Sequence, residues 1–356
     1  MAALRPGRLA IVRVYVELSR FAATATRAEL KDMIHALEDA GATGVSFSDH
    51  IFVTENDRPR AESVAHSCEP LTAMAAVVGM SDHLAVQTTV ANTAWTHPAL
   101  LLRQFAQLAV LAGGQRVTAG LGAGWSAEEF DALGVRMPSF RQRMDRLEEV
   151  VAFARSLFND RLASIAGVHV TARQVPLSPP CAVPPDLMIG GGSDRVLDLA
   201  GRYADVLELH GDPRHGKVVG ATMEQAKIGD IRRRALTTVA DLTARIQLVR
   251  AAESRAGRPP GSVSVSNTIW YVAYGDRSAV AEAERQLCRD WGHIPDQRLD
   301  SSPYLLLGEP GQIAQALVER HEAYGLDRIS LTENTGVPAA PHDPIRFCQE
   351  VVPRLP

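Results

Sequence analysis

The chain has 356 residues, of which 46% are hydrophobic and 22% charged, and its formal net charge is -4. This is the composition of a globular protein with a sizeable core, and without a basic excess we expect no nucleic-acid partner. Arg13 and Glu17 interrupt the N-terminal apolar stretch, so we expect neither a signal peptide nor a membrane span. No C-x-x-C pair occurs among the four cysteines, which favours reduced thiols in a cytoplasmic protein over a disulfide framework or a zinc site.

The predicted elements alternate between strands and helices along the chain. Apolar runs of strand length occupy residues 9–18, 44–48, 84–89, 116–121, 186–189, 206–210, 263–272 and 328–332. Helical periodicity covers residues 26–40, 70–80, 98–112, a long segment ending at 158, and then 194–203, 238–257, 278–291, 310–324 and 341–352. Local signals support several boundaries, including Thr26 with Glu29 at capping-box spacing, Pro98 in a first turn, and Gly113 after a last turn.

Eight strands that alternate with helices should run parallel, and closing them into a barrel removes the sheet edges. We therefore predict a single α/β domain over residues 1–356, a (β/α)8 TIM barrel with insertions at about 159–185, 211–237 and 292–307. The polar segment 53–69 is expected to form a loop over one end of the barrel. The alternative is a doubly wound open sheet, but the G-x-G-x-x-G fingerprint is missing after the first strand.

Sites in such barrels lie at the carboxyl ends of the strands. This rule nominates Asp49 with His50, residues 88–92, residues 122–125, residues 190–193, His210 and residues 332–334. The run Gly190-Gly191-Gly192-Ser193 leads from a strand into a helix, where free N–H groups favour a phosphate; a plain tight turn explains the glycines equally well. No H-x-H or H-E-x-x-H spacing occurs, so we expect no metal and disfavour a metal-dependent hydrolase.

Residues 119–134 read AGLGAGWSAEEFDALG, with HPALLLRQFAQLAVLAGGQRV upstream and RQRMDRLEEVV downstream. These strings resemble the luciferase-like oxidoreductases, which include relatives of bacterial luciferase that use reduced FMN and relatives that use the deazaflavin coenzyme F420. The resemblance implies a luciferase-type barrel, a homodimer, and a cofactor ring beside Gly122, Gly124 and Trp125; a purely structural role of Trp125 in the core is the alternative. We expect Glu128 and Glu129 to hold the local structure by pairing with Arg136 or Arg141.

Two further strings carry the resemblance. PPDLMIGGGSDRVLDLAGRYADVLEL implies that Gly191, Gly192 and Ser193 contact the cofactor phosphate. VSFSDHIF resembles the deazaflavin-dependent dehydrogenases, which implies that His50 works in acid–base catalysis beside the reactive carbon and that Asp49 contacts the cofactor. The end of the third strand adds Thr89 and Asn92 to the expected cofactor-binding residues, and the resemblance adds Lys217 on the phosphate, for which a solvated surface loop is the alternative.

We therefore predict a luciferase-like oxidoreductase with a flavin-type cofactor. The favoured version transfers a hydride between coenzyme F420 and a small organic substrate. One alternative is a monooxygenase that takes FMNH2 from a separate reductase and shields its chemistry with the segments around 53–69 and 292–307. A flavin-binding protein without catalysis is the other alternative. FMN-using relatives can also carry an Asp-His pair, and nothing in the sequence identifies the substrate.

Overall fold

Eight parallel strands close into a barrel. The computed structural model describes residues 11–54, 64–114, 116–215, 233–274, 277–290, 302–332 and 343–356. The barrel strands are β1 (Arg13–Glu17), β2 (Gly44–Phe47), β5 (Ala85–Thr88), β7 (Val117–Gly122), β10 (Asp186–Gly191), β11 (Val206–Leu209), β12 (Ser264–Ile269) and β15 (Leu326–Leu331). They pair in sequence order, and the pairs β1–β15 and β7–β10 complete the ring. The predicted barrel and its sequential strand order are confirmed.

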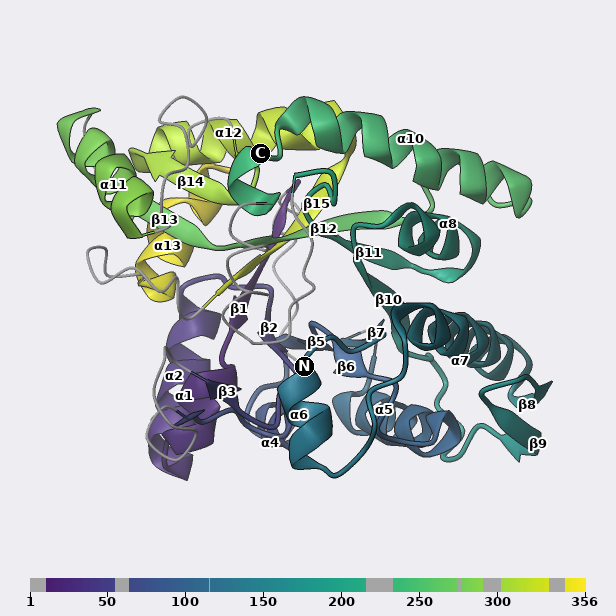
Figure 1. Cartoon of the computed structure of the whole chain (residues 1–356). Helices are drawn as coiled ribbons and strands as arrows, with labels where there is room; N and C mark the ends of the chain where they lie inside the picture. Colours follow the sequence, from purple (N-terminus) through teal and green to yellow (C-terminus); the bar gives the residue numbers. More distant parts are fainter. Residues whose placement is uncertain are drawn as a thin grey trace.

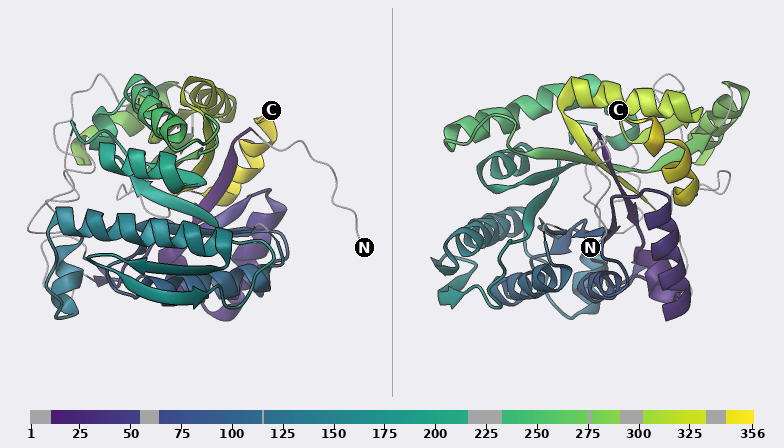
Figure 2. Two further views of the ribbon diagram at one scale, coloured as in Figure 1. Left: turned by 90° about the vertical axis from the view of Figure 1, so that its right-hand side faces the viewer. Right: turned by 180° about the vertical axis from the view of Figure 1, so that it is seen from behind.

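Helices surround this barrel (Figures 1 and 2). They are α1 (Ser19–Thr24), α2 (Arg27–Asp39), α4 (Pro70–Val78), α5 (Pro98–Ala112), α6 (Ala127–Ala132), α7 (Phe140–Asp160), α8 (Asp194–Tyr203), α10 (Val239–Arg255), α11 (Arg277–Asp290), α12 (Pro310–Tyr324) and α13 (Pro344–Glu350), followed by the short 3-10 helix η1 (Val352–Arg354). Around the outside α4 packs on α5, α7 on α8, α8 on α10 and α10 on α12, and α13 returns to α2. The apolar faces of these helices and the outward side chains of the strands form one continuous core.

The helix boundaries follow from local chemistry. Thr26 caps α2 through a reciprocal capping box with Glu29, as predicted. Pro98 begins α5, and Gly113 ends it in the left-handed conformation, with φ 65°. Gly325 ends α12 in the same way, with φ 79°. Each of these signals acts over a few residues, which is why the sequence predicts these ends well.

The insertions contain more regular structure than predicted. The first one forms an antiparallel pair of strands, β8 (Leu162–Ala166) and β9 (Thr171–Pro176). The predicted strand 263–272 is wrong at its end, because the chain leaves the barrel after β12 and continues as β13 (Tyr271–Tyr274). β13 pairs in parallel with β14 (Leu305–Gly308), which begins inside the segment predicted to be irregular. Of the insertion predicted at 211–237, residues 216–232 lie outside the described residues.

Two small strand pairs lie beside the mouth of the barrel. β6 (Ala91–Asn92) follows β5 and pairs with the end of β7, while β3 (Val53–Thr54) pairs with β4 (Val64–Ala65) in the segment predicted as a loop. In the described part of the chain, no helix combines the length and apolarity needed to cross a membrane. The single-domain assignment of residues 1–356 stays a prediction.

Candidate functional site

The predicted site residues that the structure describes gather at one end of the barrel. Asp49 and His50 follow β2, Thr89 lies between β5 and β6, and Asn92 ends β6. Gly122 ends β7, and Gly124 and Trp125 follow it, while Gly191 ends β10 and leads through Gly192 and Ser193 into α8. In a parallel barrel all these positions share the carboxyl-terminal mouth. Lys217 lies outside the described residues.

His50 is held by a carboxylate that the sequence did not reveal. Its Nδ1 lies 3.2 Å from both carboxylate oxygens of Glu129, which is 2% exposed on α6. The backbone N–H of Ile51 donates to the same carboxylate at 2.7 Å. The expected partners of Glu129, Arg136 or Arg141, are therefore wrong: this carboxylate binds the loop that carries His50. The Trp125 ring meets the imidazole edge-on, with 5.6 Å between ring centroids.

These surroundings favour the protonated form of His50. Burial acts to lower the pKa of His50, but the hydrogen bond and charge of Glu129, with the charges of Asp49 and Glu17, outweigh it and raise the pKa. Because Glu129 engages Nδ1, the nitrogen left for a ligand is Nε2. The arrangement gives an oriented imidazole that can take up and release a proton near neutral pH.

Asp49 ties two strand ends together. Its Oδ2 accepts a hydrogen bond of 2.7 Å from the backbone N–H of Asn92. The Asn92 amide in turn lies against Gly124, where a Cβ would stand 2.5 Å from Nδ2. Burial raises the pKa of Asp49 to about 6, against the opposing effects of the Asn92 hydrogen bond and of His50. Asp49, Asn92 and Gly124 are thus brought together, and the carboxyl group between them titrates near the pH of the cell.

Gly122 and Gly190, at the barrel mouth, also leave room for a neighbouring side chain. A Cβ on Gly122 would lie 2.5 Å from Val90, and one on Gly190 would lie 3.0 Å from the same side chain. Val90 therefore fills the space that these glycines leave open. Trp125 is 37% exposed, so the core alternative is wrong for this residue, and its ring is available to a ligand at the mouth. The backbone N–H of Thr89 donates to Phe47 at 2.8 Å and anchors the strand end.

The turn between β10 and α8 is tightly built. Gly191 has φ 149°, a region that side chains with a Cβ rarely adopt. A Cβ on Gly192 would stand 2.6 Å from the carbonyl oxygen of Gly211, so the turn packs directly on the end of β11. The Ser193 hydroxyl caps α8 by accepting from the N–H of Val196. The other N–H groups of the first helical turn point out of the helix end, which suits an anion.

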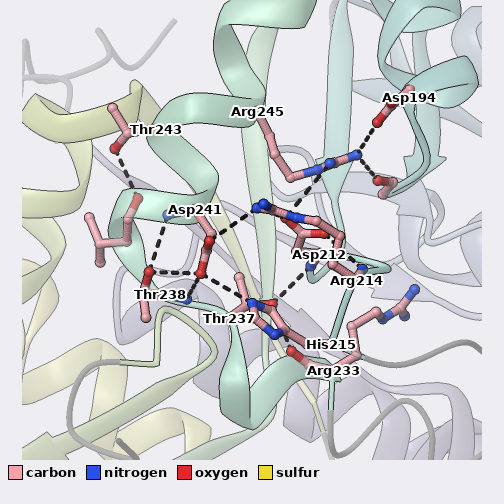
Figure 3. Close-up of polar contacts among 12 residues, drawn as sticks. Asp194, Asp212, Arg214, His215, Arg233, Thr237, Thr238, Asp241, Thr243 and Arg245 are labelled. Carbon is pink, nitrogen blue, oxygen red and sulfur yellow. Dashed lines mark hydrogen bonds and ion pairs between the residues drawn. The ribbon is translucent and has the colours of Figure 1, made fainter.

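A buried arginine supports this turn from behind (Figure 3). Arg245 of α10 is 7% exposed, and its Nη2 donates to the carbonyl of Gly192 and, at 3.0 Å, to the carboxylate of Asp194. Its Nη1 lies 3.7 Å from the buried carboxylate of Asp212. Arg245 thereby fixes the turn and neutralises the acidic residue that begins α8.

The rest of this cluster pairs carboxylates with basic side chains. Asp212 also holds Arg214, and Asp241 contacts both Arg214 and His215 (Figure 3). Interaction with Arg214 and Arg245 lowers the pKa of Asp212 despite the effect of burial. Three carboxylates therefore stand against two guanidinium groups and one histidine. Attraction of a phosphate would depend on the helix N–H groups and on further basic residues such as Lys217.

Arg143 adds a positive charge at the same end. It is the fourth residue of α7, and its Nε donates to the carbonyl of Gly124 at 3.1 Å, while another nitrogen donates to the carbonyl of Pro138. Among the described residues, no carboxylate forms an ion pair with Arg143. Its charge therefore lies beside the Gly124–Trp125 turn without a counter-ion from the described chain.

Sequence reasoning missed Glu129, Arg143 and Arg245. Glu129 and Arg143 stand within the family-like strings, but their partners are set by the fold and lie up to 79 residues away. Arg245 occurs in an ordinary helical pattern, where a solvent-facing role is the default. In the described ranges, His, Cys, Asp and Glu side chains form no group that could hold a metal ion.

Comparisons with known proteins place this chain in a family. The family model described as luciferase-like monooxygenase matches residues 14–240. The F420-dependent hydroxymycolic acid dehydrogenase of Mycobacterium tuberculosis is 31% identical over 171 residues, 48% of this chain and 45% of that protein. The FMNH(2)-dependent dimethylsulfone monooxygenase of Pseudomonas fluorescens is 24% identical over 263 residues, 71% of this chain and 70% of that protein. The chain thus matches less than half the length of the first of these relatives.

Solved structures agree on the fold. An F420-dependent secondary alcohol dehydrogenase superposes with a TM-score of 0.72 at 17% identity, covering 97% of this chain and 99% of that one. The EDTA monooxygenase from Chelativorans sp. BNC1 gives a TM-score of 0.70 at 18% identity, covering 97% and 93%. At these identities the likeness concerns the barrel alone. Because the family match covers more than half of the chain, the protein belongs to the luciferase-like monooxygenase family.

Proposed function

We propose that the protein transfers a hydride between coenzyme F420 and a small organic substrate, with His50 moving the accompanying proton. The observation that carries this proposal is the His50–Glu129 pair at the carboxyl end of β2. Here a carboxylate orients Nδ1 and raises the pKa of the imidazole, which are the two things a proton-transferring histidine needs. F420-dependent dehydrogenases among the relatives support the choice of cofactor.

The described residues fit such a cofactor. The deazaflavin ring, when bound, supplies the carbon that gives or accepts the hydride. Trp125 offers an exposed aromatic face beside His50 for a flat ring, and Asp49 with Asn92 borders the same space. The N-terminus of α8, with Gly191, Gly192 and Ser193, would bind the phosphate, and Lys217 would add a positive charge there.

His50, Glu129 and Trp125 would have different roles in the reaction. His50 gives a proton through Nε2 to the oxygen of a substrate carbonyl during reduction, or removes it from a hydroxyl during oxidation. Glu129 keeps the ring oriented and stabilises its positive charge. Trp125 covers the imidazole edge and limits the access of water to the proton transfer.

An FMNH2-dependent monooxygenase is the second candidate. The observation in its favour is the match to the dimethylsulfone monooxygenase, which covers more of the chain than the match to the hydroxymycolic acid dehydrogenase does. The oxygen chemistry of this candidate does not need a base at His50, and a separate reductase would have to supply the reduced flavin. A homodimer and a cytoplasmic location stay predictions for either candidate.

The test compares the two cofactors and then removes the imidazole. Purified protein is titrated with F420 and with FMN under identical conditions; tighter binding of F420 supports the proposal, and binding of FMN alone overturns it in favour of the monooxygenase. Binding without turnover of any substrate class would support the non-catalytic alternative.

His50→Asn should lower kcat by roughly 10²- to 10⁴-fold, because the amide cannot exchange a proton near neutral pH, and should leave the cofactor Kd nearly unchanged. The matched control is His35→Asn on the outer helix α2, where the side chain is exposed and no effect on kcat is expected. Full activity of His50→Asn would reduce His50 to an orienting hydrogen-bond donor.

A further inference from the structure

A second pair of polar side chains lies across the barrel mouth from His50. Glu208 is the third residue of β11, and Thr268 is the next-to-last residue of β12. In the barrel order β11 is the fourth strand from β2 in either direction, so the two strands stand opposite each other. Both positions are close to the carboxyl ends of their strands, the end that carries Asp49 and His50.

The two side chains face the interior of the barrel. Glu208 is the register partner of Ser266, and Thr268 lies two residues further along the same face of β12. Asn267, between them, points the opposite way, because its side chain binds Tyr324 of the outer helix α12 at 2.7 Å. Ser266 and Thr268 must therefore point inward.

A short hydrogen bond joins the pair. The Thr268 hydroxyl donates to Oε1 of Glu208 at 2.7 Å. Glu208 is 1% exposed, whereas Thr268 is partly exposed and so reaches the open mouth. The second carboxyl oxygen of Glu208 is buried, and the hydroxyl of Ser266, the register partner of Glu208, also interacts with this carboxyl group. Burying a carboxyl group inside the barrel is costly, and these neighbouring hydroxyl groups offset part of the cost.

Glu208 fixes the direction of the Thr268 hydroxyl. The Thr268 hydroxyl donates its hydrogen to Glu208, so its Oγ1 can only accept a hydrogen bond from a ligand in the barrel mouth. Burial raises the pKa of Glu208, and the hydroxyl groups of Ser266 and Thr268, followed by the Arg234 guanidinium, act against this rise. The Arg234 guanidinium is itself stacked over the Trp270 ring, 4.4 Å from its centroid, so the surroundings of Glu208 are rigidly packed.

We propose that Thr268 accepts a hydrogen bond from an N–H or O–H group of the molecule bound in the barrel mouth, and that Glu208 is the positioning residue that holds Thr268 ready. This inference rests on the proposed function, since it assumes that the mouth binds a cofactor and a substrate. Two sources offer the required donor: the imide N–H of a flavin-type ring, and a substrate hydroxyl other than the one that exchanges its proton with His50. Either would meet the protein on the side opposite His50.

The experiment measures cofactor Kd without substrate and substrate KM at saturating cofactor. Thr268→Val keeps the shape of the side chain but removes the acceptor, and it should weaken binding roughly 2- to 12-fold, the range for one neutral hydrogen bond. A rise in Kd assigns the donor to the cofactor, and a rise in KM alone assigns it to the substrate. Thr268→Ser should restore wild-type values.

Glu208 is tested through its dependence on Thr268. Glu208→Met should weaken the same binding by no more than Thr268→Val does, and Glu208→Gln, whose amide oxygen can still accept from Thr268, should retain most of the affinity. Combined with Thr268→Val, Glu208→Met should add no further loss, because a residue that acts only through Thr268 has nothing left to position. Purely structural damage would add to the effect of Thr268→Val.

Glu253→Gln is the matched control. Glu253 is also buried, and it accepts from the N–H groups of Gly261 and Val263 outside the barrel. This substitution should lower the unfolding midpoint and leave Kd and KM unchanged. Wild-type Kd and KM in Thr268→Val would overturn the inference while leaving the proposed function standing. Failure of the wild-type protein to bind either cofactor would overturn both.

Discussion

Glu129 orients the His50 ring and raises the pKa of His50. Both of its oxygens lie 3.2 Å from Nδ1, and one of them also accepts from the backbone of Ile51. The carboxylate therefore fixes the ring, the loop and the charge together, a role that second partners of catalytic histidines commonly have. Its contribution to the pKa of His50 can be separated from its contribution to the loop.

Glu129→Gln should move the pH dependence of the reaction. The amide oxygen can still accept from Ile51, but the negative charge that raises the pKa of His50 is gone. The limb of the kcat/KM profile that reports His50 should shift to lower pH, and kcat should fall by about tenfold or more as the ring loses its orientation. Glu322→Gln on the exposed face of α12 is the control. A profile that coincides with the wild type would show that Glu129 serves the loop alone.

Titration of Asp49 should make the free energy of unfolding depend on pH. Its pKa is raised to about 6 in the folded protein, so the folded state binds the proton more tightly than the unfolded state does. The stability that this proton gives is fully present below the ordinary pKa of an aspartate and is lost as the pH rises through about 6.

Asp49→Asn removes this titration and keeps an oxygen for the N–H of Asn92. Between pH 4.5 and pH 7.5, the variant should gain about 1–3 kcal/mol of unfolding free energy relative to the wild type. Urea unfolding at the two pH values measures the change, and any constant cost of the substitution cancels in the comparison. A difference between variant and wild type that is the same at both pH values would contradict the burial of Asp49.

Asp49 and His50 could be predicted as site residues from two facts: they follow a predicted strand, and sites in barrels lie at the carboxyl ends of the strands. The residues that contact their side chains could not be predicted from the sequence. Glu129 is 79 residues from His50, and its approach depends on how α6 lies over the barrel mouth. The sequence shows only which residues are close along the chain, and for Glu129 this led to the prediction of Arg136 or Arg141 as its partner.

At the scale of elements, the turn from β10 to α8 combines packing with binding. Val196 would lie 3.0 Å from a Cβ on Gly191, and the φ of this glycine is unfavourable for other residues. Gly191→Val should therefore lower the unfolding midpoint as well as the cofactor affinity. A cleaner probe of the phosphate site leaves the glycines in place.

Arg245→Met is that probe. Without the guanidinium, the carboxylate of Asp194 at the start of α8 is no longer neutralised and should repel a phosphate, weakening its binding roughly 2- to 10-fold. The comparison uses whichever cofactor the protein binds and the phosphate-free form of the same cofactor. Only the phosphorylated form should lose affinity. An equal loss for both forms would place the phosphate elsewhere.

Elements were predictable where their signals are local. The ends of α2, α5 and α12 depend on caps within a few residues, and all three were found. The pairing of β13 with β14 joins segments about thirty residues apart, outside the regular βα order, and no local pattern indicates it. The predicted seventh strand was too long for this reason, because its apolar sequence runs on after the chain has left the barrel.

At the scale of the whole molecule, a buried arginine links strands across the barrel interior. Arg328 of β15 is 1% exposed, and its Nη1 donates to Gln87 of β5 at 3.1 Å and to Thr118 of β7 at 3.2 Å. Its guanidinium also lies over the ring of Tyr15 of β1, 5.0 Å from the centroid, and 3.9 Å from the carboxylate of Asp186 of β10. One side chain thus contacts four other strands of the closed ring.

Arg328→Met should therefore loosen the barrel as a whole. The substitution leaves the oxygens of Gln87 and Thr118 buried without their donor and removes the charge facing Asp186, at a cost of about 2–4 kcal/mol of unfolding free energy. Arg285→Met on α11, where the side chain is 57% exposed and pairs with Glu282 alone among the described residues, should change stability by about 0.5 kcal/mol or less. Urea unfolding of both variants measures the difference. Because Arg328 lies at the amino ends of the strands, away from the mouth, the folded fraction of Arg328→Met should keep the wild-type cofactor Kd. An Arg328→Met protein as stable as the wild type would show that the barrel is held by its apolar layers alone.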